Sequence, residues 1–178
     1  MESGYASLTT RKVADRAGAP LSQIHYHFGS KHALVLGLLE YINDQRRVLY
    51  EDTFSEDLPL HEVWNKAGQV FMDDLESGYT RVMQELTAAG YSDPVIGAQV
   101  AEQFTQWTIV LSQFGKRIKQ ETGSLGPLSP MEFGALLDAA AIGINQCMLL
   151  RIPTEKMPAL SALGKFGSLL QTWEQNSD

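Results

Sequence analysis

Apolar residues recur at every third or fourth position through most of this chain, and this periodicity constrains the fold more than any other feature. The longest periodic segment runs from Pro94 to about Glu121. Its apolar positions are Val100, Phe104, Trp107, Leu111, Phe114 and Ile118. An α-helix repeats one face with this spacing, whereas a half-buried strand alternates at every second residue. We find no such alternation over a strand length, so the sequence predicts an all-α fold.

Gly, Pro and Ser residues divide the periodic segments into eight expected helices. Gly18 ends the first helix and Ser30 caps the third, on which we expect Leu34, Leu38 and Ile42 to form the buried stripe. Met1 to Tyr5 is typical of a helix end that runs into a turn. The expected helices are 10–17, 20–28, 31 to about 52, 59–76, 79–89, 94 to about 121, 130–150 and 157–175.

The composition is that of a globular protein in a reducing compartment. The chain has 178 residues, of which 44% are hydrophobic and 20% are charged. Its one cysteine, Cys147, excludes an internal disulfide framework. No apolar run reaches the ~20 residues of a membrane helix, and Met1 to Thr10 lacks the pattern of a signal peptide. We therefore expect a soluble cytoplasmic protein without a membrane partner.

Charge is distributed unevenly along the chain. The net charge is −7, yet residues 1–50 carry six Lys and Arg against four Asp and Glu, a net of +2 that leaves −9 for the rest. Such asymmetry is expected when a small basic region docks on phosphate and an acidic body stays away from it. Random scatter of charge also explains a value as small as +2, so charge alone does not decide the function.

Two short expected helices, 10–17 and 20–28, flank a turn centred on Gly18. A helix-turn-helix needs this arrangement, because its second helix enters the DNA major groove, which is ~12 Å wide. Thr and basic residues near the start of the first helix are suited to phosphate, and Gln and Tyr on the second are suited to base edges. The predicted DNA-binding residues are Thr10, Arg11, Ser22, Gln23, His25, Tyr26, His27 and Lys31.

These residues resemble a known family. Residues 8–14 (LTTRKVA), 17–18 (AG) and 24–34 (IHYHFGSKHAL) are similar to the DNA-binding domain of TetR-type (tetracycline-repressor-like) bacterial regulators. The resemblance implies a homodimer whose N-terminal helix-turn-helix domain binds operator DNA. It also implies a helical C-terminal domain that dimerises and binds a small molecule that releases the DNA.

The sequence departs from the family pattern in three ways. The first of the family's three DNA-binding-domain helices should precede Gly4, so about one average helix of ~12 residues is expected to be missing. Pro20 and Leu21 stand where the family usually has a polar cap and a polar or basic residue. His25 replaces a more usual Tyr, which makes one phosphate contact sensitive to pH in principle.

Other functional patterns are weak. His25 and His27 lie ~200° apart on a helix and cannot chelate one metal together. Neither a nucleophile with its base nor a Gly-rich phosphate loop is found, so we expect no enzyme activity, no metal and no cofactor. Asp73, Asp74 and Glu76 are interpreted as a solvated face, and Cys147 as a buried structural thiol.

Aromatic, Met and amide side chains on the central helices suggest an apolar effector cavity. Cavities between bundle helices are lined in this way, although any one of these residues could equally belong to the core. The predicted pocket residues are Trp64, Phe71, Met72, Met83, Phe104, Trp107, Leu111, Asn145, Gln146 and Met148.

The last two expected helices carry the predicted dimer interface. Small residues between Ala139 and Gly143 allow helices to approach closely, as in a four-helix bundle across a two-fold axis. An intramolecular core explains the same pattern equally well, and the resemblance favours the dimer. The predicted interface residues are Phe133, Leu137, Ala140, Ile144, Leu163, Phe166, Leu170 and Trp173.

Taken together, the sequence predicts a DNA-binding domain at 1–45 and a ligand-binding and dimerisation domain at 46–178. The expected function is a transcriptional repressor that a small apolar molecule releases from operator DNA. Two alternatives stay open: a ligand-binding or scaffold dimer without DNA-binding activity, and a small all-α enzyme that uses the central pocket.

Overall fold

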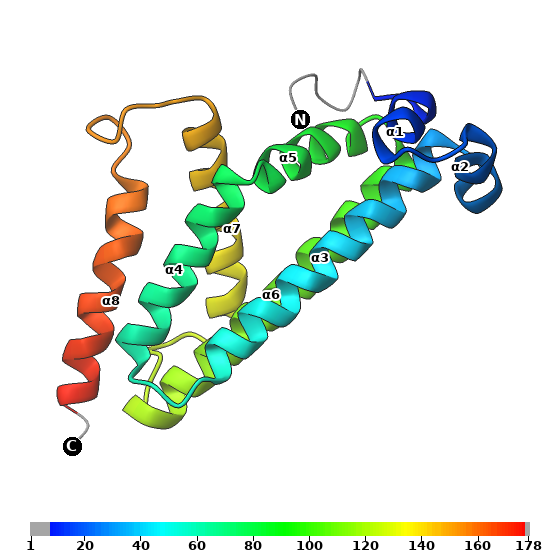
Figure 1. The fold of residues 1–178 in the computed structure, drawn as a ribbon. Helices are drawn as coiled ribbons and strands as arrows, with labels where there is room; N and C mark the ends of the chain where they lie inside the picture. Colours follow the sequence, from blue (N-terminus) through cyan, green and yellow to red (C-terminus); the bar gives the residue numbers. More distant parts are fainter. Residues whose placement is uncertain (1–7, 177–178) are drawn as a thin grey trace.

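A computed structural model describes residues 8–176, which form eight α-helices and no named strand (Figure 1). The all-α prediction is confirmed, and every expected helix is present with small shifts at its ends. The expectation for Met1 to Tyr5 lies outside the described residues. The helices are α1 (Thr10–Ala17), α2 (Leu21–Phe28), α3 (Lys31–Ser55), α4 (Leu60–Glu76), α5 (Tyr79–Gly90), α6 (Pro94–Thr122), α7 (Pro130–Leu149) and α8 (Ala159–Gln175).

Side-chain caps fix several helix starts where the sequence placed them. The Thr9 hydroxyl accepts the Lys12 N–H at 3.2 Å, and the Ser30 hydroxyl accepts the Ala33 N–H at 3.1 Å. Asp93 caps α6 by accepting the N–H groups of the two residues after Pro94. Each cap satisfies a backbone donor that a helix start leaves without an intrahelical partner.

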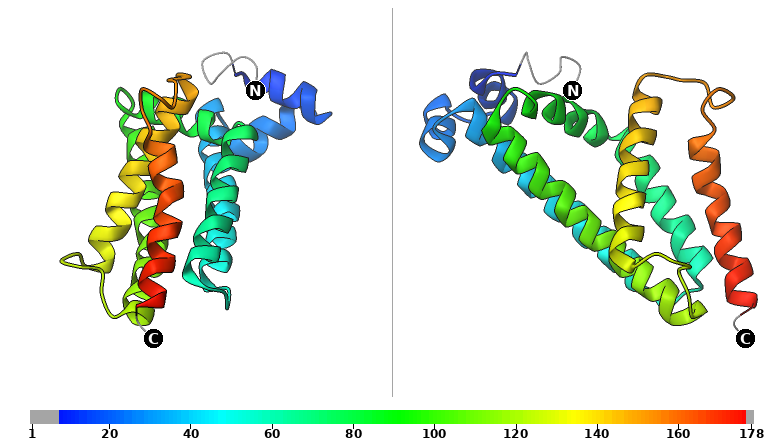
Figure 2. Two further views of the ribbon diagram at one scale, coloured as in Figure 1. Left: turned by 90° about the vertical axis from the view of Figure 1, so that its left-hand side faces the viewer. Right: turned by 180° about the vertical axis from the view of Figure 1, so that it is seen from behind.

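The two longest helices, α3 and α6, run side by side and carry the small helices α1 and α2 at one end (Figures 1 and 2). Helix α7 packs against α6, and α8 packs against α4. Helix α5 extends from the end of α4 toward the α1–α2 end, where α6 begins (Figure 1). The chain thus forms a small helical head on a larger helical body.

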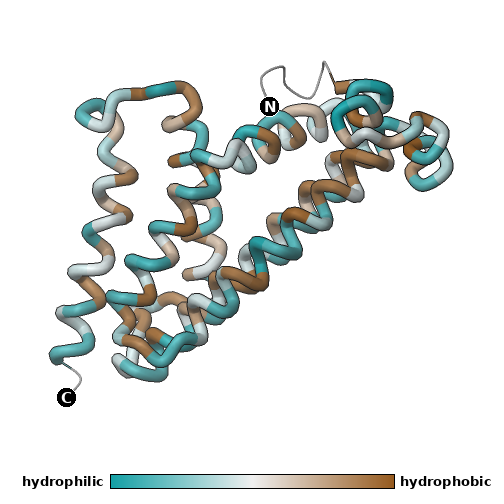
Figure 3. Tube along the Cα trace, in the orientation of Figure 1, coloured by the Kyte–Doolittle hydropathy of each residue, from teal (hydrophilic) through white to brown (hydrophobic). Residues whose placement is uncertain are grey.

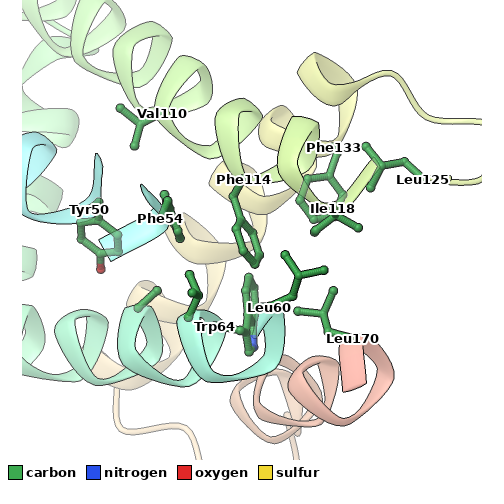
Figure 4. Packing of buried hydrophobic residues seen from close by; sticks show 12 residues of the cluster. Tyr50, Phe54, Leu60, Trp64, Val110, Phe114, Ile118, Leu125, Phe133 and Leu170 are labelled. Atoms are coloured by element: carbon green, nitrogen blue, oxygen red, sulfur yellow. The ribbon is translucent and has the colours of Figure 1, made fainter. Parts of the chain in front are cut away.

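The main core lies in the body, between α3, α4, α6, α7 and α8. Phe114 is fully buried there, and its ring stacks on Phe54 and Trp64 with ring centroids 4.9 and 5.8 Å apart (Figure 4). Leu60 and Leu170 complete the layer below them. Rings stacked in this way bury large apolar areas, which is the dominant stabilising contribution in such a core.

Helices α6 and α7 approach so closely that one position requires glycine. A Cβ atom added to Gly134 would lie 2.5 Å from the Thr108 carbonyl oxygen and 2.7 Å from the Ser112 nitrogen. Both are backbone atoms, which cannot move aside as a flexible side chain can. The close approach allows Phe133, the residue just before Gly134, to bury its ring in the core.

The buried stripe of α3 differs from the expected one. Leu34 is buried, but Leu38 is 40% exposed and Ile42 is only half-buried. Instead, Val35 and Leu39 pack with residues of α5 and α6. The prediction for Leu38 was wrong because α3 carries apolar residues on two faces, and only its packing partners decide which one is buried.

Apolar and polar residues alternate along the helices of the body, and long uniformly apolar segments are missing from the described chain (Figure 3). Among residues 8–176, no helix is long and apolar enough to cross a membrane.

Candidate DNA-binding surface and effector cavity

Helices α1 and α2 form a compact helix-turn-helix on the start of α3. Gly18 ends α1 in the left-handed conformation (φ 62°), where a side chain would be strained. Behind the turn, Ala14, Ile24 and Leu34 form a small buried cluster, one residue from each helix. This cluster fixes the orientation of α2 on α3.

Helix α2 presents a polar face to solvent. Within it, Ile24 is the buried residue, and the five predicted DNA-binding residues of α2 are exposed. The Tyr26 side chain is 85% exposed, and its ring meets the edge of His27 at 5.2 Å. An exposed ring of this size has little stabilising role, so it is free to contact a partner.

The remaining predicted DNA-binding residues lie beside this face. Arg11 is exposed on α1, whereas Thr10 and Lys31 are half-buried at the starts of α1 and α3. Helix starts with exposed N–H groups and basic side chains are suited to phosphate. The structure thus gathers all eight predicted residues at one end of the molecule.

The body holds a cavity of about 130 Å³ between α3, α4, α5, α6 and α7. Five of its apolar lining residues were predicted: Phe71, Met83, Phe104, Trp107 and Leu111. The predicted Asn145 also lines it, and its side-chain oxygen is buried without a hydrogen-bond partner among the described residues.

Four predicted pocket residues do not line this cavity. Trp64 belongs to the core, where its indole N–H donates to the Leu163 carbonyl at 2.9 Å. Gln146 is exposed and donates to the side-chain oxygen of the lining residue Gln84 at 3.4 Å, and Met148 lies one turn beyond the cavity beside the α7–α8 loop. Met72 is half-buried on a side of α4 that faces away from the lining.

Polar residues that the sequence did not assign to the cavity, Asp74 and Tyr79, line one side of it and are held by partners on α3. Arg46 on α3 pairs with Asp74 at 2.7 Å, and its guanidinium lies 6.0 Å from the centre of the Tyr79 ring. The Tyr79 hydroxyl donates to the side-chain oxygen of Asn43, which is fully buried. Asp74 itself is 5% exposed, so interpreting it as part of a solvated face was wrong.

The two cavity carboxyl groups have perturbed acidity. Burial raises the pKa of Asp74 to about 6, although Arg46 beside it favours the charged form. Burial also raises the pKa of Asp138 to about 6, against a hydrogen bond from the Thr108 hydroxyl at 3.4 Å. Burial further raises the pKa of Tyr50 and of Tyr79, so both phenols are neutral at physiological pH.

Most residues predicted for a dimer interface serve the core of the chain itself. Leu170 is fully buried, Phe133 and Ile144 are nearly so, and the Phe166 ring packs on Trp64 at 4.8 Å. Leu137, Leu163 and Trp173 also pack against the main core. Of the predicted set, only Ala140 is exposed. Helices α7 and α8 each have a second apolar face, and the spacing did not show which face turns inward.

That outer face is where a second copy could pack. Leu136 on α7 is 59% exposed, Met131 is also exposed, and Leu169 is exposed on α8. The small residues Ala135, Ala139 and Ala140 are exposed along α7 as well. Exposed apolar and small residues therefore recur along α7, whereas on α8 the exposed Leu169 lies one turn after the exposed Lys165.

One ion pair connects the head to the body. His32 Nε2 on α3 lies 3.5 Å from Asp93 Oδ2, and the other oxygen of Asp93 caps α6. Elsewhere in the described residues, no three His, Cys, Asp or Glu side chains lie close enough together to hold a metal ion.

Comparison with known proteins agrees with this geometry. Residues 1–38 match the sequence model of a family described as bacterial regulatory proteins, tetR family. No curated protein matches the chain.

Two solved structures share the fold. One, described as a TetR-family transcriptional regulator from Rhodococcus sp., has 22% identity and a TM-score of 0.74, covering 93% of this chain and 88% of its own. The other, a TetR transcriptional regulator from Legionella pneumophila, has 18% identity and a TM-score of 0.72, covering 94% of this chain and 88% of its own. As the resemblance indicated, residues 1–38 match the model of the tetR family of bacterial regulatory proteins, and the chain shares its fold with two proteins described as TetR regulators.

Proposed function

We propose that this chain is a homodimeric transcriptional repressor that a small molecule bound in the central cavity releases from operator DNA. The observation that carries the proposal is the polar, almost wholly exposed face of α2 in a helix-turn-helix of the tetR type. A single helix with such a face fits the major groove.

On DNA, the side chains of the head have different tasks. Gln23 and Tyr26 project from the middle of α2 and read base edges. Thr10, Arg11, Ser22, His25, His27 and Lys31 contact the sugar–phosphate backbone and fix the register. Two heads of a dimer reach successive major grooves when they are about 34–36 Å apart or a multiple of this distance.

Helix α3 supports the transmission of the ligand signal. It has 25 residues and is therefore about 37 Å long. Lys31 at its first turn belongs to the DNA surface, and Tyr50 near its other end lines the cavity. A ligand that displaces the end of α3 at the cavity also reorients the head at the opposite end. The expected domain boundary at 45/46 falls within this continuous helix, and it stays a prediction.

Helix α6 provides a second connection. Phe104 and Trp107 line the cavity from the middle of α6, and Asp93 at its start contacts His32 of the head. The effector changes DNA affinity only if it binds the released arrangement more tightly than the DNA-bound one.

The proposed dimer forms through the outer faces of α7 and α8. Exposed apolar residues there, including Leu136 and Leu169, need a partner in solution. A two-fold axis through this face brings two copies of each helix together as a four-helix bundle.

The proposal is tested with the purified chain and the DNA that flanks its own coding sequence. Fluorescence anisotropy should show specific binding with an affinity that falls steeply as salt rises. The double variant Gln23→Ala/Tyr26→Ala should reduce specific binding to the level of unrelated DNA, because both side chains are exposed and their removal leaves the fold intact. The matched control is Tyr91→Ala, which removes an equally exposed ring from the body. A dimer that binds no DNA at low salt would overturn the repressor proposal in favour of the ligand-binding or enzyme alternatives.

A further inference from the structure

The central cavity contains one carboxylate that the chain does not balance. Asp74 is paired with Arg46, but among the described residues no Lys, Arg or His lies within ion-pair distance of Asp138. The Thr108 hydroxyl is the partner that Asp138 has, at 3.4 Å, and it supplies no charge. The charges of Arg46 and Asp74 cancel, so an ionised Asp138 leaves the cavity with one uncompensated negative charge.

Several aromatic side chains line the cavity that contains this charge. Phe71, Tyr79, Phe104 and Trp107 reach the cavity from α4, α5 and α6. The negative face of an aromatic ring attracts a cation within about 6 Å of its centre, and more strongly where water is excluded. One cation of the chain already uses this arrangement, since Arg46 lies against both the Tyr79 ring and the Asp74 carboxylate.

Helix α7 places two acceptors on the cavity side. Asp138 and Asn145 are seven residues apart, so they lie on the same face two turns from each other, with Ala141 and Ile142 between them. The Asn145 oxygen is buried and unpartnered among residues 8–176. A buried acceptor without a partner is costly, and a donor on a ligand satisfies it. Both polar groups of this face thus accept hydrogen bonds or positive charge.

From this arrangement we infer that the effector is a compact lipophilic cation, an aromatic or branched-alkyl group bearing a protonated or quaternary amine, with Asp138 as its counter-charge. The inference rests on the proposal that this cavity is the effector site. The volume of about 130 Å³ limits the apolar part to about one ring, because a cavity on the order of 150 Å³ holds a benzene molecule.

Other ligand charges fit less well. An anion would meet the Asp138 carboxylate, and the one guanidinium at the cavity, that of Arg46, is already held by Asp74 and Tyr79. A neutral hydrocarbon fills the apolar walls but leaves Asp138 and the Asn145 oxygen without partners. A protonated amine supplies both a positive charge for Asp138 and a donor for the Asn145 oxygen, whereas a quaternary amine supplies the charge alone.

The test compares probes of equal shape and different charge on the full chain at pH 8. Phenyltrimethylammonium and tert-butylbenzene differ by one nitrogen for one carbon, and benzenesulfonate supplies a comparable anion. Binding is followed by the fluorescence of Trp107 in the cavity wall and by calorimetry. We expect phenyltrimethylammonium to bind at least tenfold more tightly than tert-butylbenzene, and benzenesulfonate to bind most weakly.

Two variants locate the effect. Asp138→Asn keeps the shape of the side chain and should lower the affinity for phenyltrimethylammonium about tenfold or more, while tert-butylbenzene binding stays within about twofold. Asp73→Asn is the matched control, because it removes an exposed carboxylate next to the cavity residue Asp74. It should leave both affinities nearly unchanged.

Acidification gives a third comparison that needs no variant. Between pH 8 and pH 5, protonation of the cavity carboxyls should reduce the preference for phenyltrimethylammonium over tert-butylbenzene. Burial raises the pKa of Asp74 on α4 and of Asp138 on α7 to about 6, so these two carboxyls change charge in this range. Burial also raises the pKa of Tyr50 on α3 and of Tyr79 on α5, so both phenols stay neutral. Arg46 on α3 and the exposed Asp73 on α4 are the other charged groups beside the site.

Equal affinities of the cation and its neutral isostere for the wild-type chain would overturn the inference, as would an unchanged preference in Asp138→Asn. These measurements use no DNA, so they are independent of the repressor proposal. Cation binding without release of bound DNA would count against the ligand-controlled repressor and leave the cavity assignment standing. Operator binding without a preference for the cation would count against the cavity inference and leave the repressor proposal standing.

Discussion

The head and the cavity of this molecule differ in how their functional side chains are supported. In the head, three buried residues from α1, α2 and α3 hold a surface whose functional groups point into solvent. In the body, the cavity is assembled from five helices, and its functional groups are wholly or partly buried. The head side chains can therefore be replaced at little cost to the fold, whereas each cavity residue has a structural role as well.

The same contrast appears in the distances along the chain. The functional residues of the head lie between Thr10 and Lys31, so they come from two short helices and the start of a third. The cavity brings Tyr50 on α3 together with Asn145 on α7, 95 residues later in the sequence. The functional residues of the head can therefore be recognised as a local sequence motif, whereas those of the cavity cannot.

The largest effect is expected where α6 and α7 touch, because the cavity depends on that contact and the head does not. Gly134→Ala should destabilise the chain by about 2–3 kcal/mol, since the new methyl group overlaps the backbone of α6. Urea unfolding measures the change. Gly143→Ala on the same helix has open space around it and should instead stabilise by about 0.5–1 kcal/mol. A gain of similar size in both variants would show that helix propensity, and not close packing, controls this helix.

Variants of the head should separate contacts that read the base sequence from contacts with the phosphates. Gln23→Ala should change the preference among operator variants by about 1–3 kcal/mol at the bases it reads. Lys31→Ala should weaken binding to all sequences alike and reduce the salt slope by about 1. Competition binding at several salt concentrations measures both effects. If the two variants alter specificity equally, the assignment of α2 as the reading helix is wrong.

Helix positions were predictable from the sequence because their determinants are local. Thr9, Ser30, Asp93 and Ser129 each accept a backbone N–H at a helix start, and glycines such as Gly18 end the helices. The residues predicted to bind DNA could be identified for the same reason, since a motif within 30 residues carries them. Whether they bind DNA stays a prediction that the anisotropy experiment addresses.

The cavity was predictable in its apolar lining and in Asn145, but not in its carboxyl groups. Phe104 and Trp107 stand out by type, but the carboxyls of Asp74 and Asp138 look like ordinary surface groups on amphipathic helices. Tertiary packing buries them, and nothing local in the sequence signals it. The predicted dimer residues show the same limit, because Phe133 and Leu170, which are buried within the chain itself, satisfy the spacing of an outer face as well as that of an inner one.

Asp138 should lower the stability of the chain at neutral pH. Its pKa of about 6 in the folded state lies above its ordinary value of 3.8, so the folded state holds the proton more tightly. Its stabilising effect is full below pH 4 and is lost as pH rises through about 6. Asp138→Asn should therefore be more stable than wild type at pH 8, by about 1 kcal/mol or less because the group is partly solvated, and equal to it at pH 4.

Thermal unfolding from pH 4 to pH 8 measures this difference, with an expected gain of about 2–4 °C at pH 8 for each kcal/mol. Glu132→Gln on the same helix is an informative contrast. Its pKa is lowered by hydrogen bonds from Ser129, so its contribution is present above its ordinary pKa and is lost on acidification. Opposite pH trends for the two variants would support buried and capping roles respectively; parallel trends would contradict them.

The smallest change in stability is expected where the two regions meet. The His32–Asp93 pair is about one-third exposed on both sides, and exposed pairs contribute only about 0–1 kcal/mol. His32→Gln should therefore change the free energy of unfolding by less than about 0.5 kcal/mol.

We expect it to act instead on the link between the regions, because Asp93 caps the helix that carries Phe104 and Trp107 into the cavity. DNA affinity should be measured with and without a saturating effector, and the ratio of the two should fall toward one in the variant. Asp93 itself is a poor choice, since its removal also costs the cap. A ratio identical to that of wild type would mean that α3 alone carries the signal, through Tyr50, from the cavity to the head.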